Sequence, residues 1–154
     1  MHKSTLNACF VALLLSTSLN VASAQEKASA TPPVLKTQIG DATFYASNFQ
    51  GRKTASGQIF DKNKAMAAHR TFPFGTVVRV TNIRNKRSVN VVIVDRGPYG
   101  KNRREGAIID VSPAAAERLG ILKVGQARVK LEVLVWGNGE RFNQRSKIVD
   151  TARR

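Results

Sequence analysis

The sequence is poor in cysteine, in aromatic residues and in acidic residues, and these shortages exclude several kinds of protein. Among 154 residues there is one cysteine, Cys9, and aromatic residues make up 6% of the chain. A single cysteine cannot form an intramolecular disulfide, so packing must stabilise the fold. The most apolar run, Ala8 to Leu15, is too short to span a membrane, and we expect no membrane span elsewhere.

The first residues have the composition of a secretory signal peptide. His2 and Lys3 precede the apolar run, and Ala22-Ser23-Ala24 supplies the small residues that a signal peptidase requires before Gln25. We therefore expect residues 1–24 to be a signal peptide that is cleaved between Ala24 and Gln25. The mature protein would then occupy the periplasm or the extracellular cell-wall space. A buried N-terminal helix is the alternative for this run.

Cys9 follows Leu6-Asn7-Ala8, which has the letters of a bacterial lipidation box. It precedes most of the apolar run, whereas a cleavage site lies after that run. We therefore expect a protein that is not lipidated. Because Cys9 leaves with the signal peptide, the mature chain would contain neither a disulfide nor a thiolate nucleophile.

Basic residues strongly outnumber acidic ones. The chain has 25 Lys and Arg against 10 Asp and Glu, and removal of residues 1–24 takes away Lys3 and no carboxylate, which leaves 24 against 10 and a net charge of +14. Such a charge predicts an anionic partner. An exported protein rarely meets nucleic acid, and the sequence has no aromatic-rich nucleic-acid motif. We therefore expect anionic envelope polymers and no nucleic acid; the alternative is that the charge only maintains solubility.

The composition predicts one folded domain between two extensions. Residues 25–38 are rich in Lys, Ser, Ala and Thr, contain Pro32-Pro33, and predict a flexible leader. We expect the domain to cover residues 39–136. The polar, basic residues 137–154 predict a disordered tail.

Several segments have the composition of β-strands. Thr76–Asn82 and Ser88–Val94 are rich in β-branched residues and flank the polar turn Arg84–Arg87, which predicts a β-hairpin. Three further segments are predicted to be strands because they alternate polar and apolar residues or contain β-branched residues. They are Ala42–Tyr45, Ile108–Val111 and Ala127–Val135.

The remaining segments predict a loop and a helix. Gly51–Gly57 is polar and turn-rich, which is typical of a surface loop. Ser112–Gly120 predicts a short helix, because Ser112 can cap its start, Pro113 suits the first helical position, and Gly120 suits a left-handed exit. Many short strands with one small helix predict a closed or nearly closed barrel of roughly 100 residues.

Five motifs occur in an order that resembles the rare lipoprotein A family. They cover the chain from about Gly40 to Leu134 and are, in sequence order, Gly40-Asp41-Ala42-Thr43-Phe44-Tyr45, Gly51-Arg52-Lys53-Thr54-Ala55-Ser56-Gly57, Ala67-Ala68-His69-Arg70-Thr71-Phe72-Pro73-Phe74-Gly75-Thr76, Val94-Asp95-Arg96-Gly97-Pro98-Tyr99 and Ile109-Asp110-Val111-Ser112. The resemblance implies a mainly β fold, a six-stranded double-psi β-barrel with one or two short helices. It also implies endolytic cleavage of peptidoglycan between N-acetylmuramic acid and N-acetylglucosamine, which leaves 1,6-anhydro ends.

The resemblance also assigns site residues. It places the catalytic aspartate at Asp95 and the active-site histidine at His69. Seven further residues in or beside the motifs are expected to bind the glycan; they are Tyr45, Thr54, Ser56, Gln58, Arg96, Tyr99 and Asp110. Gln58 departs from the family, which commonly has a glutamate there, and an amide cannot exchange a proton near neutral pH.

The residues themselves leave alternatives for each of these roles. A lytic transglycosylase uses the 6-hydroxyl of its own substrate as nucleophile, so Asp95 could act first as acid and then as base; alternatively, it only hydrogen-bonds the following turn. His69 is a catalytic assistant or a buried structural histidine. Asp110 supports Ser112 or a neighbouring loop by hydrogen bonds, or it is a second carboxylate.

The aromatic and basic candidates also have two interpretations. Tyr45 and Tyr99 stack on sugars or pack in the barrel. The basic residues Arg96, Arg103 and Arg104 are interpreted as solvated charges that attract anionic glycan. No cluster of His, Cys and carboxylates has metal-ligand spacing, so no metal or cofactor is expected.

Two functions are consistent with these patterns. The first is a peptidoglycan lytic transglycosylase that acts on glycan strands, with or without stem peptides. The second is a non-catalytic, expansin-like protein that binds wall polysaccharide or loosens it, because loss of the glutamate at Gln58 would be tolerated there.

Overall fold

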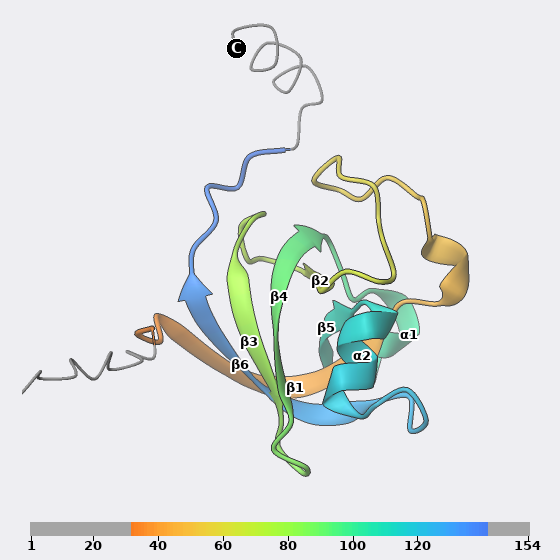
Figure 1. Ribbon diagram of the computed structural model, residues 1–154, viewed down its shortest axis with the longest axis vertical. Helices are drawn as coiled ribbons and strands as arrows, with labels where there is room; N and C mark the ends of the chain where they lie inside the picture. The colour runs from red at the N-terminus through yellow and green to blue at the C-terminus, as the bar shows by residue number, and fades with distance from the viewer. Residues whose placement is uncertain (1–31, 142–154) are drawn as a thin grey trace, which may run out of the picture. The chain divides into compact units, whose positions relative to one another are not determined.

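Six strands close into a barrel in the computed structural model, which describes residues 32–141 (Figure 1). The strands are β1 (Lys36–Phe44), β2 (Met66–His69), β3 (Val77–Asn82), β4 (Ser88–Asp95), β5 (Ala107–Val111) and β6 (Ala127–Val135). Their order around the barrel is β1-β5-β2-β4-β3-β6, and β6 pairs with β1 to close it. The expected six-stranded, mainly β barrel is confirmed. The expected signal peptide lies outside the described residues.

The expected hairpin is formed by β3 and β4. These strands pair antiparallel, with Val78 opposite Val91 and Val80 opposite Val89. All four of these side chains are buried. The alternation seen in the sequence therefore places one face of the hairpin in the core. β4 ends at Asp95.

β2 is a strand that the sequence pattern did not reveal. Its residues Met66-Ala67-Ala68-His69 are all buried, so they show no alternation between buried and exposed positions, and they lack the β-branched residues typical of strands. The strand forms because it pairs on both sides, parallel with β4 and antiparallel with β5. In this register Ala68 lies opposite both Asp95 and Asp110.

β1 begins at Lys36, which is earlier than the expected start of the domain near Ile39. Lys36, Thr37 and Gln38 pair antiparallel with the end of β6, and this pairing orders a polar stretch that was expected to belong to the leader. At the other end of the domain, the backbone N–H groups of Gly137 and Gly139 donate hydrogen bonds to Thr76 and Phe74. The first residues of the expected tail are thus attached to the barrel.

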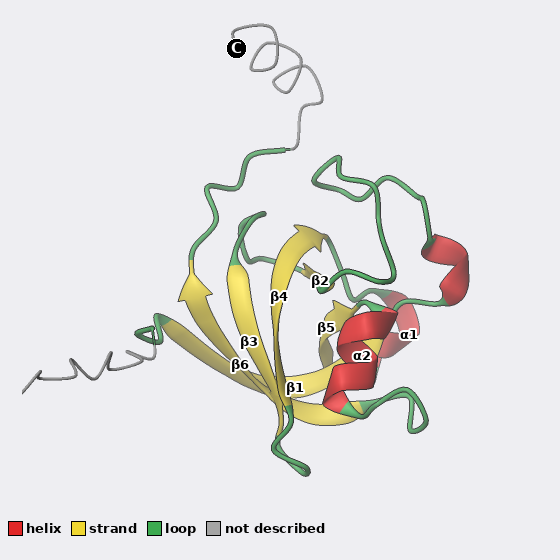
Figure 2. Cartoon of the chain, viewed as in Figure 1, coloured by secondary structure: helices red, strands yellow, loops and turns green. Residues whose placement is uncertain are grey.

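Two α-helices lie on one side of the barrel (Figure 2). α2 (Pro113–Leu119) has the caps expected from the sequence: Ser112 Oγ accepts a hydrogen bond from the N–H of Ala115, and Gly120 ends the helix with φ 71°. α1 (Gly100–Arg104) was not expected as a helix, and a short 3-10 helix (Ser47–Phe49) follows β1.

The core has two parts. The larger part fills the barrel with the inward side chains of the strands and the buried face of α2, including Ile93, Ile109 and Leu131. The smaller part lies outside this cluster and consists of Tyr45, Phe60, Met66, Ala68 and Val94. Within residues 32–141, no helix is both long and apolar enough to cross a membrane.

Candidate active site

Asp95 lies at the end of β4, where its carboxylate accepts three hydrogen bonds. Oδ2 accepts from the phenol of Tyr45 at 2.9 Å, and Oδ1 accepts from the backbone N–H groups of Ala55 and Arg96, each at 2.8 Å. Donors of this kind stabilise a negative carboxylate and fix its orientation. The carboxylate is therefore held by its own following residue and by two residues, Tyr45 and Ala55, that lie 50 and 40 positions away in the sequence.

The loop that supplies the N–H of Ala55 is built by the hydroxyl residues on either side of it. Thr54 Oγ1 donates to the carbonyl oxygen of Gln58 at 2.9 Å and lies 3.1 Å from Ser56 Oγ. The N–H of Ser56 donates to the carbonyl oxygen of Val94, the residue before Asp95. Thr54 and Ser56 are buried, and they attach the loop to the end of β4.

Tyr45 contacts Asp95 from the end of β1. Its ring is 8% exposed and packs against Phe60, with 4.5 Å between ring centroids, and against Phe49 at 5.2 Å. Burial, and then the negative charge of Asp95, raises the pKa of Tyr45. The phenol therefore stays protonated near neutral pH and donates a hydrogen bond to Asp95.

Asp110 is a second carboxyl group beside Asp95. Thr43 Oγ1 donates a hydrogen bond to Asp110 Oδ1, and Asn102 Nδ2 donates to Thr43 Oγ1 at 3.4 Å. Burial raises the pKa of Asp110, the hydrogen bonds from Thr43 and Asn102 oppose this shift, and the charge of Asp95 adds to it. Asp110 therefore holds a proton to higher pH than an ordinary aspartate.

Gly97 allows the backbone to pass close to Asp110. A Cβ atom on Gly97 would lie 3.3 Å from Asp110 Oδ2 and 3.4 Å from Ala68 Cβ, and its φ of +153° is one that side-chain-bearing residues rarely adopt. A larger residue would push the backbone away from the carboxyl group. The Gly97-Pro98 turn thus positions the segment after Asp95 against β5.

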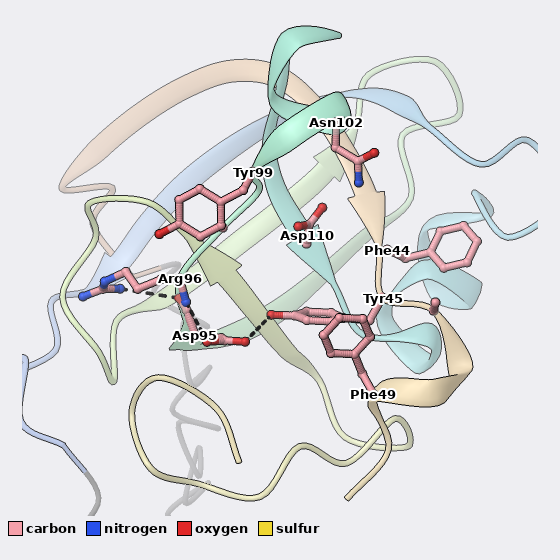
Figure 3. A pocket seen from close by; sticks show the side chains of 10 residues that line it. Phe44, Tyr45, Phe49, Asp95, Arg96, Tyr99, Asn102 and Asp110 are labelled. Atoms are coloured by element: carbon pink, nitrogen blue, oxygen red, sulfur yellow. Dashed lines mark hydrogen bonds between the residues drawn. The ribbon is translucent and has the colours of Figure 1, made fainter. Parts of the chain in front are cut away.

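Asp95 and Asp110 line one pocket, shown in Figure 3. Its volume is about 360 Å³, and its other lining side chains include Tyr45, Phe49 and Tyr99. Tyr45 is buried, whereas the ring of Tyr99 is 61% exposed. The pocket therefore offers two carboxyl groups beside aromatic surface, a combination suited to a sugar and to proton transfer.

Arg96 lines the pocket, but the interpretation of its side chain as a solvated charge is wrong. Its guanidinium lies 3.7 Å from the ring centroid of Phe74, and Nη1 donates to the carbonyl oxygens of His69 at 3.3 Å and Phe72 at 3.0 Å. Cation–π and hydrogen-bond contacts hold the side chain in place. Arg96 therefore stabilises the chain around the site. Arg103 and Arg104 are exposed, as expected.

His69 does not line this pocket, and the structure contains no hydrogen bond between its ring and Asp95. Nδ1 accepts hydrogen bonds from the N–H groups of Thr71 at 3.3 Å and Phe72 at 3.0 Å, and Nε2 lies 3.2 Å from Gln38 Oε1. Nε2 must then carry the proton. Burial, followed by the charges of Arg70, Arg96 and Lys36, lowers the pKa of His69 to about 4.

Gln58 also lies outside the lining of the pocket. Its carbonyl oxygen accepts hydrogen bonds from both the N–H and the hydroxyl of Thr54. The structure thus brings four of the expected site residues to Asp95, and they are Tyr45, Arg96, Tyr99 and Asp110. The expected glycan contacts of Thr54, Ser56 and Gln58 stay predictions.

Two polar residues of the site were missed by the sequence analysis. Thr43 lies within one of the recognised motifs, and its position two residues before Tyr45 on a strand could have indicated a side chain facing the same side. Asn102 lies on α1, for which the sequence showed no helical pattern. Within residues 32–141 the structure contains no group of three or more His, Cys, Asp or Glu residues that could hold a metal ion.

The family follows from a comparison of the sequence with models of protein families. Residues 37–131 match the model of a family described as lytic transglycolase, with a name that denotes a double-psi β-barrel. The chain belongs to this lytic transglycolase family. The match contains β2 to β5, all of β1 except Lys36, and every residue that lines the pocket.

Curated relatives agree with this assignment. A probable endolytic peptidoglycan transglycosylase RlpA of Treponema pallidum is 56% identical over 92 residues, which are 60% of this chain and 28% of the relative. The endolytic peptidoglycan transglycosylase RlpA of Neisseria meningitidis strain Z2491 is 50% identical over 101 residues, which are 66% of this chain and 41% of the relative. The chain thus spans less than half the length of these relatives.

Solved structures show the same fold. A Streptomyces papain inhibitor has a TM-score of 0.52 at 23% identity, and the match covers 68% of this chain and 100% of that one. An expansin of Clavibacter michiganensis, solved with cellohexaose, has a TM-score of 0.50 at 20% identity and covers 65% of this chain and 51% of the expansin. Together with the family match, these likenesses confirm the expected double-psi β-barrel.

Proposed function

We propose that this domain is an endolytic peptidoglycan transglycosylase that cleaves between N-acetylmuramic acid and N-acetylglucosamine and leaves a 1,6-anhydro end. The observation that carries the proposal is the pair of carboxyl groups, Asp95 and Asp110, in one pocket of about 360 Å³. The names of relatives at 50% and 56% identity support the substrate and the reaction.

The two carboxyl groups have different surroundings, and this difference suggests their roles. Burial raises the pKa of Asp110, which favours a protonated acid that can donate to the glycosidic oxygen. The carboxylate of Asp95 accepts three hydrogen bonds, which fix its orientation at the pocket so that it can take a proton from the substrate. We therefore assign Asp110 as the acid and Asp95 as the base, instead of giving both roles to Asp95.

The proposed reaction needs no water molecule as nucleophile, because the 6-hydroxyl of the substrate takes that role. Asp110 donates its proton to the bridging oxygen, and the bond from that oxygen to C1 of N-acetylmuramic acid breaks. The 6-hydroxyl oxygen of the same sugar bonds to C1, and its proton passes to Asp95. Proton exchange with solvent restores Asp110 and Asp95. Tyr99, which is exposed at the pocket, offers an aromatic face to a sugar ring.

Digestion of purified sacculi tests the proposal. Wild-type protein should release products with 1,6-anhydro ends, counted by mass spectrometry. Asp95→Asn and Asp110→Asn should each lower the rate by about 10²–10⁴-fold while glycan binding is retained, because each amide keeps the size of the side chain but cannot transfer the proton. If the Asp110→Asn variant released anhydro products at the wild-type rate, Asp110 would not be the acid.

A non-catalytic, expansin-like binding function is the second candidate. It is favoured by Gln58, which replaces a glutamate that the resemblance led us to expect. The same experiment separates the two functions. A wild-type protein that binds sacculi yet releases no anhydro product, with stem peptides present or removed by an amidase, would establish the binding function instead.

We also propose that the chain acts in the periplasm or the cell-wall space after cleavage between Ala24 and Gln25, without a lipid on Cys9. The Ala22-Ser23-Ala24 sequence and the position of Cys9 before most of the apolar run support this. Mass analysis of the N-terminus of protein from an envelope fraction tests it. A mature chain that begins with an acylated Cys9 would contradict it.

A further inference from the structure

One pole of the barrel, opposite the pocket, is formed by the turn between β3 and β4. β4 begins at Ser88 beside this turn and ends at Asp95, and an eight-residue strand spans roughly 25 Å. In Figure 1 the turn lies at the lower end of the barrel and the end of β4 at the upper end. A ligand at this pole would therefore bind far from the two carboxyl groups.

The turn is held against the end of α2 by side-chain hydrogen bonds. Nδ2 of Asn82 and Nδ2 of Asn85 both donate to the carbonyl oxygen of Leu119, at 3.1 Å and 3.0 Å. Nη2 of Arg87 donates to the carbonyl oxygen of Glu117 at 3.0 Å. These bonds satisfy carbonyl groups at the helix end and fix the position of the turn.

A pocket of about 440 Å³ lies between the turn and the segment that follows α2. Arg84 and Asn85 line it from the turn, Gly120 and Val124 line it from the segment after α2, and Arg128 lines it from β6. The turn and this segment therefore form one continuous surface, although they lie far apart in the sequence.

The surface carries cations that have no partner in the described part of the chain. Arg84, Lys86 and Lys123 are exposed, and none of them forms an ion pair or a side-chain hydrogen bond within residues 32–141. Arg128 pairs with Asp41 at 3.5 Å. An anionic ligand could therefore approach three cations that no acidic side chain neutralises.

Two aliphatic side chains are exposed on either side of Lys123. Leu122 is 41% exposed and Val124 is 63% exposed. Aliphatic side chains beside unpaired cations are typical of surfaces that bind the headgroup region of a bilayer, since the apolar groups enter it while the cations contact phosphates.

We propose that this pole docks on a bilayer surface that contains anionic phospholipids. Leu122 and Val124 would enter the interfacial region, and Arg84, Lys86 and Lys123 would contact the lipid phosphates. The pocket with Asp95 would then face away from the membrane. An anionic polymer without acyl chains would also attract the cations, but it would gain nothing from the two aliphatic side chains.

Vesicle binding of the full chain tests this proposal. The probes are vesicles of pure phosphatidylcholine and vesicles of equal parts phosphatidylcholine and phosphatidylglycerol, with bound protein measured by sedimentation. The first variant is Lys86→Asn with Lys123→Gln, since Lys86 has φ 63° and asparagine tolerates that conformation. The second is Leu122→Ser with Val124→Ser. The control is Lys62→Gln with Lys64→Gln, which removes the same charge elsewhere.

The wild type should bind the anionic vesicles and not the neutral ones. The lysine variant should bind about 25-fold more weakly, since each cation near an anionic surface contributes about five-fold. The aliphatic variant should bind about ten-fold more weakly, and the control should bind as the wild type does. All variants keep the same N-terminal residues, so any contribution from these cancels.

Three results would overturn the proposal: no wild-type binding to anionic vesicles, an equal loss in the Lys62 and Lys64 control, or full binding by the aliphatic variant. The last result would show that the cations alone bind anionic surfaces and that the two aliphatic side chains do not enter a bilayer. Thermal unfolding of each variant verifies that it is folded. None of these measurements depends on catalysis, so the outcome is independent of the proposed transglycosylase activity.

Discussion

The phenol of Tyr45 donates a hydrogen bond of 2.9 Å to Oδ2 of Asp95. The two residues lie at the ends of β1 and β4, which are not neighbours in the barrel. Because Tyr45 is buried against Phe49 and Phe60, its hydroxyl has a fixed position. The contact therefore orients the carboxylate before any substrate binds, and pre-organisation of this kind lowers the cost of proton transfer.

Tyr45→Phe should lower kcat about ten-fold and leave KM nearly unchanged, because the ring keeps its packing while one donor to Asp95 is lost. The measurement is the rate of anhydro-product release as a function of substrate concentration and pH. A change in the pH profile would show that the phenol acts through the carboxylate. Tyr99→Phe is the matched control, since Tyr99 has no hydrogen bond to Asp95, and an equal loss of kcat in that variant would contradict the positioning role.

Asp110 should make the protein less stable as the pH rises. Its pKa in the folded state is raised from 3.8, so the folded protein binds this proton more tightly than the unfolded chain does. The stability that the protonated group contributes is present below pH 3.8 and is lost as the pH rises through the folded pKa. Urea unfolding at several pH values should show this loss in the wild type and not in Asp110→Asn. Parallel pH dependence in both proteins would contradict it.

His69 should make the protein less stable as the pH falls below 6.5. Its pKa is lowered from 6.5 to about 4 in the folded state, so the unfolded chain binds this proton more tightly. Stability should be full above pH 6.5 and should fall as the pH drops from 6.5 through about 4. His69→Gln should remove this dependence in urea unfolding curves. A wild type whose stability is constant over that range would show that the ring is not buried in its neutral form.

Gln58→Glu should change the rate of anhydro-product release by less than about two-fold, because a general acid and a general base are already present in Asp110 and Asp95. The side chain of Gln58 does not line their pocket. The assay is the sacculus digestion described above, on glycan with and without stem peptides. An increase of ten-fold or more would show that this position takes part in catalysis, and the assignment of the acid to Asp110 would then fail.

The local sequence determined several elements of this protein to within about one residue at each end. Short-range patterns were sufficient for the β3–β4 hairpin and for α2, because β-branched alternation, Ser112 and Gly120 act within a few residues of their own positions. Motif order was sufficient to identify the family, which the family match confirms. It also singled out Asp95, which lies at the end of β4. Local patterns did not reveal β2, since a strand buried on both faces shows no alternation.

Only the tertiary structure decided how the site is composed. Tyr45 and Asp95 are 50 positions apart in the sequence, and Thr43 and Asp110 are 67 apart, so the pairing of strands, and not local preference, brings them together. Strand pairing also places His69 outside the pocket and beside Gln38. The sequence had predicted that Gln38 belongs to a flexible leader. Strand register moves a side chain from one face of a sheet to the other with a shift of a single residue. A motif can therefore identify a chemically capable side chain, but closure of the barrel determines which groups share its pocket.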